Sequence, residues 1–385
     1  MLPRTSDRLA EYLRAINGLS PLIARERASF DQTRRLPDSV FDALADAGLF
    51  RLWLPKALGG PELSPVEFMT VVEAASALDG SVGWLVGNGG GMSRIGGYLP
   101  AGTARAWFSD PRAFVASATG AVGAARKAPG GYRLSGRWPF GSGAYHATHY
   151  MALASVKDLD GRDGPPLCCY AARRDVTIHD TWKVSGLRAT GSCDFEMHDV
   201  FVPEDDTHLF IGHTPTEAGA IYRLPALSVF AWTVSVVPLG IARGAIDAFI
   251  KLASRKTRPG TSALLCDRET VQSTVGRLET LHQAARAFLV QSMNELTAAM
   301  EEEGTHLVQA RAMFRAACAH AAESASRIVE TLATETGAAS IFEASPLERA
   351  VRDVHAAAKH IAMSPNNYIV VGRLALGLDP GAARF

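Results

Sequence analysis

A serine between two glycines, Gly141-Ser142-Gly143, follows an aromatic run within the stretch Leu134–Tyr150, LSGRWPFGSGAYHATHY. The rings around it belong to Trp138, Phe140, Tyr145, His146 and His149. Glycine allows another group to approach the backbone closely. Flat rings beside main-chain N–H groups and a hydroxyl suit a planar, partly polar cofactor. The same stretch is also typical of a β-hairpin corner whose rings belong to the core, so these residues alone leave both interpretations open.

A second candidate segment is rich in small residues, GSVGWLVGNGGGMSRIGG over Gly80–Gly97. Its glycines permit close helix packing or the close approach of a ligand. They also suggest room for a bulky planar substrate and little grip on a charged one. The segment is not a phosphate-binding loop, because it contains no Gly-Lys-Ser or Gly-Lys-Thr and no strand precedes it to form a dinucleotide fingerprint.

Composition excludes several partners. Lys plus Arg and Asp plus Glu both number 39, whereas binding to nucleic acid requires a basic excess. The five cysteines form no CxxC pair and have no metal-ligand spacing with histidine, so we expect no metal site and a reducing cytoplasm. The N-terminus has no secretory apolar core. The most apolar stretch, Ala226–Ile250, contains Arg243 and Asp247, which favours a buried helix over a membrane span.

The hydrophobic period divides the chain into three parts. Residues 1–110 have a helical period, and 111–215 contain short apolar runs separated by Gly, Pro or Asp, which is typical of a small antiparallel β domain. Residues 216–385 return to a helical period. There we predict helices over 224–255, 268–302, 305–337 and 346–362, with Ala-rich faces that suit a bundle. The predicted class is α+β, mostly helical, with an N-terminal helical domain, a β domain and a C-terminal helical bundle.

This order, read with several motifs, resembles the acyl-CoA dehydrogenase superfamily. The motifs that carry the resemblance are Leu36-Pro37 with Ala47-Gly48-Leu49, Leu58–Glu62, Asp79–Trp84, Leu134–Gly136, Val184–Ser192, Val200–Glu204 and Arg352–His355. No single motif is specific, but their order extends over nearly the whole chain. The resemblance implies a helical domain, a β domain and a four-helix bundle, in a homo-oligomer that is a tetramer.

Within this superfamily the chain looks like the flavin-dependent monooxygenase branch. The dehydrogenases need a Glu base to remove a proton α to the thioester. At the usual position this chain has Lys359-His360-Ile361-Ala362, and at the alternative position it has Phe230. A dehydrogenase without its base is expected to be nearly inert. An acyl-CoA dehydrogenase that uses FAD and an unrecognised base, and a non-catalytic flavin-binding homologue, are the alternatives.

The resemblance implies an oxygenase that receives reduced flavin, FMN or FAD, from a separate NAD(P)H:flavin reductase. This chain itself shows no NAD(P)H fingerprint. With O2 the flavin forms a C4a-(hydro)peroxyflavin, which oxygenates an aromatic, polycyclic or amine-bearing small molecule. The choice between FMN and FAD, the choice between C-, N- and S-oxygenation, and the substrate itself are open at this point.

By the same resemblance His360 holds or delivers the proton of the peroxide, since imidazole titrates near neutrality, and Ser142 donates a hydrogen bond to the flavin. His355 falls on a nearly opposite helix face, which favours a tether between helices or a subunit contact over a role at the same ligand. The expected flavin-binding residues are Ser117, Thr119, Trp138, Phe140, Gly141, Ser142, Thr190, Gly191, Ser192 and Arg255. The expected substrate-binding residues are Trp84, Asn88, Met92 and Tyr368, of which the first three follow one helix face and are equally compatible with packing.

Overall fold

The computed structural model describes residues 6–156, 164–257, 262–300 and 305–381. By compactness the chain divides into two units. The sheet unit comprises Met1–Phe68, Leu85–Val184 and Arg188–Ala226, and the bundle unit comprises Met69–Trp84, Ser185–Leu187 and Leu227–Phe385. The divisions after Phe68 and Trp84 fall inside helices α3 (Pro65–Leu78) and α4 (Gly80–Met92). The division into three domains at residues 110 and 215 stays a prediction.

In the sheet unit, a capping residue and the spacing of apolar residues explain where α1 (Asp7–Thr33) begins and how it packs. The other helices of this unit include α2 (Asp38–Asp46), α5 (Ala101–Phe108) and α6 (Ala220–Arg223). Short 3-10 turns connect them and the strands: η1 (Lys56–Leu58), η2 (Ser93–Gly97), η3 (Arg173–Asp175), η4 (Arg188–Thr190) and η5 (Glu204–Asp206). Ser6 caps α1 by accepting a hydrogen bond from the main-chain N–H of Leu9 at 3.2 Å. Every seventh residue from Leu9 to Phe30 is buried, so α1 packs along one narrow stripe.

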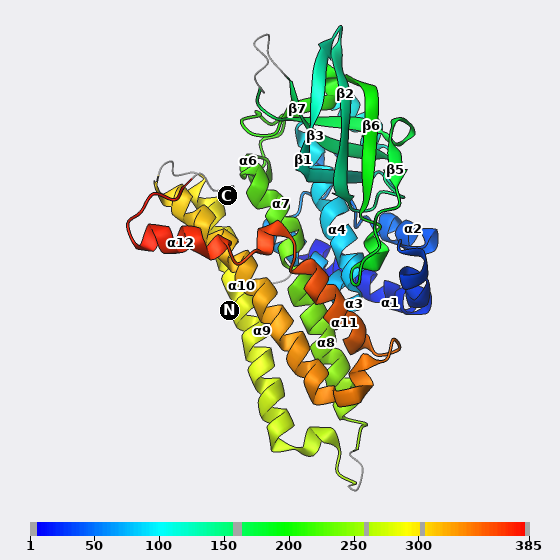
Figure 1. Ribbon diagram of the computed structural model, residues 1–385, viewed down its shortest axis with the longest axis vertical. Helices are drawn as coiled ribbons and strands as arrows, with labels where there is room; N and C mark the ends of the chain where they lie inside the picture. Colours follow the sequence, from blue (N-terminus) through cyan, green and yellow to red (C-terminus); the bar gives the residue numbers. More distant parts are fainter. Residues whose placement is uncertain (1–5, 157–163, 258–261, 301–304, 382–385) are drawn as a thin grey trace. The chain divides into compact units, whose positions relative to one another are not determined.

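The strands of the sheet unit form one seven-stranded sheet in the order β5-β6-β2-β1-β3-β4-β7 (Figure 1). The strands are β1 (Val115–Ala128), β2 (Gly131–Gly141), β3 (His149–Val156), β4 (Leu167–Ala172), β5 (Thr177–His179), β6 (Cys193–Pro203) and β7 (Thr207–Leu209). Neighbouring strands are antiparallel, as predicted, except for β1 and β3. These two run parallel because β2 turns back along one edge of β1, and β3 then joins the other edge in the original direction.

The core of the sheet is aromatic. Trp138, Tyr150 and Phe195 are fully buried, and the rings of Trp138 and Phe195 stack with centroids 5.5 Å apart. Two glycines make room for the indole. A Cβ at Gly123 would lie 2.3 Å from the Trp138 ring, and one at Gly136 would lie 2.8 Å from it. These glycines are therefore required by the packing of Trp138.

The bundle unit consists mainly of helices that run side by side, as α8 to α11 do in Figure 1. The helices are α7 (Ala226–Ser235), α8 (Val237–Ala253), α9 (Glu269–Ala299), α10 (Thr305–Thr336), α11 (Pro346–Ala357) and α12 (Asn367–Ala375), with turns η6 (Leu265–Asp267), η7 (Gly337–Ile341) and η8 (Ile361–Met363). Glycines let α8 approach α3 closely. A Cβ at Gly240 would lie 2.4 Å from the Cβ of Ser76, and one at Gly244 would lie 2.4 Å from the carbonyl oxygen of Ala77. The expected close packing of small residues is present here.

The last predicted helix, 346–362, ends earlier than expected. Ser345 caps α11 by accepting from the main-chain N–H of Leu347 at 3.3 Å, but the helix stops at Ala357. His360 is extended, with φ −65° and ψ 137°, and its side chain accepts the main-chain N–H of Ala362. The interpretation of His355 and His360 as two positions on one helix is therefore wrong, because His360 lies beyond the helix end.

The apolar stretch Ala226–Ala253, which covers α7 and α8, is long and apolar enough to cross a membrane by composition. In the structure 83% of its most apolar window is buried within the protein. Burial of this extent is the behaviour of a core helix of a bundle.

Candidate functional site

Three hydroxyl groups come together in the sheet unit. Ser142 follows β2, and Thr190 and Ser192 lie just before β6. The Ser142 and Ser192 hydroxyl oxygens are 2.8 Å apart, and those of Thr190 and Ser192 are 2.7 Å apart. All three residues are buried. The structure thus joins three predicted cofactor residues, from segments about 50 positions apart in the sequence, into one hydrogen-bonded cluster.

The backbone around this cluster is tied together as well. The main-chain N–H of Gly143 donates to the carbonyl oxygen of Thr190 at 2.7 Å. Gly191 has φ +53° and Gly143 has φ +76°, a conformation that favours glycine. These contacts fix the hydroxyl cluster on rigid main chain, which is what a precise hydrogen-bonding site requires.

The glycines beside Ser142 are required by the protein's own rings. A Cβ at Gly143 would lie 2.5 Å from the ring of Phe114. A Cβ at Gly141 would lie 2.8 Å from the ring of Phe195. The sequence alone left open whether a ligand or core rings approach these glycines, and in the structure core rings do.

The two aromatic candidates before Ser142 behave differently. Trp138 is 0% exposed, and its indole N–H donates to the carbonyl oxygen of Leu153 at 2.9 Å. It is a core residue of the sheet. Phe140 is 65% exposed and has φ +65°, a strained conformation for a bulky residue. Such strain is concentrated at functional sites, and Phe140 is the aromatic neighbour of Ser142 that stays accessible.

Ser117 and Thr119 lie on β1 and are half-buried. Ser117 pairs with Met151 of β3, but the register of this pair shifts between Ala118 and Val122. Thr119 lies in that irregularity and has no partner residue on β3. A local break of this kind re-aims side chains and is common beside active sites.

His360 is the central candidate of the bundle unit. Its Nδ1 accepts the main-chain N–H of Ala362 at 3.2 Å, so the proton of the neutral ring is carried by Nε2. Burial, with a smaller contribution from the charge of Arg315, lowers the pKa of His360 to about 4. At neutral pH the ring is therefore a neutral Nε2–H donor. The ring of Trp84 meets it edge-on, with centroids 5.6 Å apart.

The neighbouring candidates of the bundle unit already have partners. His355 is exposed, and its Nε2 lies 3.2 Å from Glu330 of α10, in accord with a tether between helices. Tyr368 on α12 donates to Glu323 at 2.8 Å, and this bond together with burial raises the pKa of its phenol. The structure therefore brings Trp84 to His360, and ties Tyr368 to a carboxylate of α10.

The remaining candidate residues lie on α4 and in the turn that follows α8. Asn88 and Met92 continue the face of α4 on which Trp84 lies, Met92 being 4% exposed and Asn88 half-buried. Arg255 is exposed in the turn after α8, where its main-chain N–H donates to the carbonyl oxygen of Leu252. Arg258, Pro259 and Gly260, which follow it closely in the sequence, lie outside the described residues.

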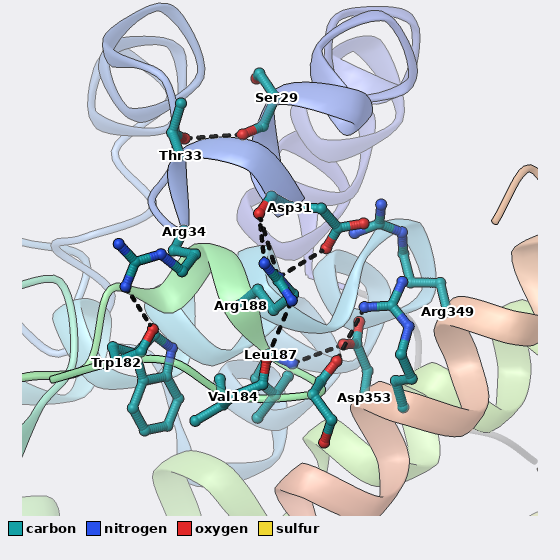
Figure 2. A network of polar contacts seen from close by, with 12 residues as sticks. Ser29, Asp31, Thr33, Arg34, Trp182, Val184, Leu187, Arg188, Arg349 and Asp353 are labelled. Atoms are coloured by element: carbon teal, nitrogen blue, oxygen red, sulfur yellow. Dashed lines mark hydrogen bonds and ion pairs between the residues drawn. The ribbon is translucent and has the colours of Figure 1, made fainter.

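Two of the motifs that suggested the family meet in the bundle unit. The main-chain N–H of Leu187 donates to the Asp353 carboxylate at 2.7 Å (Figure 2). Arg352 donates to the carbonyl oxygen of Ser185 at 2.9 Å. A Cβ at Gly186 would lie 2.0 Å from the carbonyl oxygen of Arg352. The segments Val184–Ser192 and Arg352–His355 are thus one structural contact, which holds the helix that precedes His360.

The motif Val184–Ser192 is also anchored in the sheet unit. The Arg188 guanidinium donates to the carbonyl oxygen of Asp31 at 2.9 Å and to that of Val184 at 3.3 Å (Figure 2). These bonds place η4, and with it Thr190, against the end of α1. Among the described residues, no three His, Cys, Asp or Glu side chains are placed to hold a metal ion.

One residue of this region was missed by the sequence reasoning. Arg315 of α10 is 6% exposed, and its guanidinium donates to the carbonyl oxygen of Ile361 and to the side chain of Asn367. The available signal was a charged residue within the apolar run Phe314–Ala322. Its position beside His360 depends on a contact 45 residues away and is invisible to local patterns.

Comparison with known proteins agrees with this arrangement. Residues 19–103 match the acyl-CoA dehydrogenase N-terminal domain family, and residues 232–365 match the acyl-CoA dehydrogenase C-terminal domain family. XiaF from Streptomyces sp., solved in complex with FADH2 and glycerol, superimposes with a TM-score of 0.89 and 28% identity over 98% of both chains. The predicted fold is confirmed.

Relatives of known activity cover nearly the whole chain. Indole-3-acetate monooxygenase of Pseudomonas putida is 31% identical over 363 residues, which span 92% of each protein. The flavin-dependent monooxygenase oxygenase subunit HsaA of Mycobacterium tuberculosis is 27% identical over 382 residues, 96% of each. The chain therefore belongs to the acyl-CoA dehydrogenase superfamily and, within it, to the flavin-dependent monooxygenases.

Proposed function

We propose that this chain is the oxygenase component of a two-component system that transfers one oxygen atom from O2 to an aromatic small molecule. The observation that carries the proposal is His360. Where a dehydrogenase needs a carboxylate base, this chain has a half-buried imidazole held neutral, with its proton on Nε2. Among the described residues no carboxylate pairs with this ring. Such a group donates a hydrogen bond and cannot remove an α-proton as a carboxylate does.

His360 is proposed to hold the proton of the oxygen-bearing group. Because its pKa is lowered to about 4, the ring neither charges nor changes its tautomer between pH 6 and 8. The ring of Trp84 packs edge-on against one side of the imidazole. A fixed donor in a dry environment stabilises developing negative charge without reorganising.

The cluster of Ser142, Thr190 and Ser192 is proposed to bind the flavin. The Ser192 hydroxyl is hydrogen-bonded to those of both Ser142 and Thr190, so the three groups orient one another. Phe140, exposed and strained beside Ser142, is proposed to pack on the planar ring system, and Thr119 at the irregularity of β1 to contact its polar edge. The residues present therefore fit a planar ligand with polar edges.

Reduced flavin, when bound, supplies the oxygen-transfer chemistry by forming a C4a-(hydro)peroxide with O2. The FADH2 in the XiaF structure favours FADH2 over reduced FMN, and the name of HsaA as an oxygenase subunit favours a separate NAD(P)H:flavin reductase. Exposed Arg255 is proposed to reach a flavin phosphate. A cytoplasmic homotetramer remains our expectation for the assembly.

The test is to mix the protein with reduced FAD or reduced FMN without oxygen and to follow the flavin spectrum after oxygen is added. We expect a transient species that outlives the oxidation of free flavin, with the preferred flavin giving the longer life. His360→Asn keeps an acceptor for the N–H of Ala362 but removes the imidazole, so it should shorten this life by about 100-fold. His355→Asn, a nearby exposed histidine, is the matched control and should leave it unchanged.

Other outcomes have clear meanings. Direct return to oxidised flavin with both cofactors would contradict the proposal. Bleaching of the oxidised flavoprotein by an acyl thioester would establish the dehydrogenase alternative. If His360→Asn and Ser142→Ala both leave the reaction unchanged, the residues that we propose do not carry the activity.

A further inference from the structure

Arg315 carries a buried positive charge for which the residues that the structure describes supply no counter-charge. It lies on α10 and is 6% exposed. One guanidinium nitrogen, Nη2, donates to the carbonyl oxygen of Ile361 at 3.4 Å and to the side-chain oxygen of Asn367 at 3.3 Å. Both distances are long for N–H···O bonds, and Nε is buried with no partner. The donor capacity of this side chain is therefore largely unused.

The acceptors around Arg315 are all neutral. Asn367 is held in place by a second bond, from its amide nitrogen to the carbonyl oxygen of Ala362 at 2.8 Å. The carboxylate of Glu323, on the same helix, accepts from Tyr368. No carboxylate among the described residues forms an ion pair with Arg315, and Arg311, one turn earlier, adds a like charge. Buried charges in proteins are normally paired, so an anion from outside the chain is the missing partner.

This charge lies at the site of the proposed chemistry. The segment that accepts from Arg315 begins at His360, and the charge of Arg315 contributes to the lowered pKa of His360. The ring of Trp84 packs edge-on against His360. One corner of the bundle unit thus combines a buried cation, a neutral imidazole donor and a large aromatic ring.

We propose that Arg315 binds the carboxylate of an aromatic acid, and that the substrate of this enzyme is such an acid. The planar guanidinium presents paired N–H donors that match the two oxygens of a carboxylate. Trp84 offers the aromatic contact for the ring, and His360 the donor at the reacting end. A flavin phosphate is the other possible anion. It lies at the far end of the ribityl chain from the reactive ring, whereas Arg315 lies beside His360. The proposal rests on the proposed function, which it extends by naming the substrate class.

The test measures binding of matched acid and amide pairs by calorimetry on the full-length protein. The pairs are benzoate and benzamide, phenylacetate and phenylacetamide, and indole-3-acetate and indole-3-acetamide. In the wild type we expect at least one acid to bind about 10- to 100-fold more tightly than its amide, the range that charge-assisted hydrogen bonds provide. Arg315→Gln should remove this preference, and Arg315→Lys should keep part of it. Arg327→Gln, at an exposed position on the same helix, is the matched control and should keep all of it.

Several results would overturn the proposal. These are equal binding of acid and amide in every pair, a failure of all three acids to bind, or an acid preference that survives Arg315→Gln. A loss of FMN binding relative to riboflavin in Arg315→Gln, with the acid preference intact, would assign Arg315 to the flavin phosphate instead. If Arg315→Gln does not fold, the acid and amide affinities of the wild type and of Arg315→Lys still test the proposal.

The outcome is separable from that of the proposed function. Binding of acids requires neither flavin nor oxygen, so it can depend on Arg315 even if no transient flavin species forms. Conversely, the flavin reaction of the wild type is followed without any aromatic acid, so its result does not depend on acid binding. A changed flavin reaction with an unchanged acid preference would show that Arg315 serves the oxygen chemistry and does not bind the substrate.

Discussion

Replacement of His360 by asparagine tests the electrostatic state of the proposed proton donor. The imidazole Nδ1 accepts the N–H of Ala362, and asparagine, among the best residues at a helix N-cap, can accept the same bond. The variant thus removes the titrating group while retaining the local cap. Its effect on stability should depend on pH in a way that follows from the pKa.

The magnitude follows from proton linkage. Burial lowers the pKa of His360 from 6.5 to about 4, so below pH 6.5 the unfolded chain binds a proton here that the folded protein does not. The resulting loss of stability begins as the pH falls below 6.5 and is complete near pH 4. It amounts to a few tenths of a kcal/mol at pH 7, about 2 kcal/mol at pH 5 and about 3 kcal/mol at pH 4. Because the His360→Asn variant lacks the titrating ring, its free energy of unfolding should not show this decrease.

The assay is urea unfolding of both proteins at pH 7, 6 and 5, followed by tryptophan fluorescence. Burial also lowers the pKa of His149 and of His208 to about 4, but both proteins share these groups, so only the difference between the curves reports on His360. His355→Asn controls for the removal of an exposed histidine from the same segment. If the unfolding free energies of wild type and His360→Asn run parallel from pH 7 to 5, His360 is not a buried neutral donor, and the proposed role fails.

Other residues give further predictions. Ser142→Ala should lower the free energy of unfolding by about 1 kcal/mol, because a buried hydroxyl partner is lost, and should weaken reduced-FAD binding in an anaerobic titration; unchanged affinity would exclude the flavin contact. Gly186→Ala should lower the free energy of unfolding by about 2 kcal/mol or more, since its Cβ would lie 2.0 Å from a main-chain oxygen. Gly276→Ala, at an exposed position of α9 with open space around it, should raise the free energy of unfolding by about 1 kcal/mol. Equal melting temperatures of these two variants would refute the packing argument. Burial and a neighbouring carboxylate raise the pKa of Asp353 to about 7, so its ionisation destabilises the fold as the pH rises through 7. Asp353→Asn, which can still accept from Leu187, should therefore melt higher than wild type at pH 8, and a lower melting temperature would show that the charge is needed.

The order of helices, strands and helices was predictable because hydrophobic period is a local property. Whether an aromatic ring belongs to the core or faces a ligand was not predictable. Trp138 and Phe140 are two residues apart on one strand, yet one is the centre of the sheet core and the other is exposed. The glycines beside Ser142 were compatible with a ligand or with core rings, and at Gly143 the ring of Phe114 is what approaches. A glycine reports that something approaches closely, and only the folded chain shows what it is.

His360 illustrates what motifs contribute and where they stop. The sequence showed that an imidazole replaces the expected carboxylate, and this fixed the class of chemistry. It did not show that α11 ends at Ala357, nor that the N–H of Ala362 determines the ring's tautomer. Both depend on the course of the main chain after the helix.

By itself, therefore, the sequence determined the family, the order of the elements and the residue types of the candidate site, because each is encoded in contiguous residues. Tertiary structure decided which of them act together. The hydroxyls of Ser142 and Ser192 meet across 50 positions, and Arg315 reaches Ile361 across 46. The glycine-rich segment suggested little grip on a charged substrate, but the buried cation comes from a distant helix. Its missing counter-charge is visible only when all neighbours are in place, since burial and pairing are properties of the folded protein.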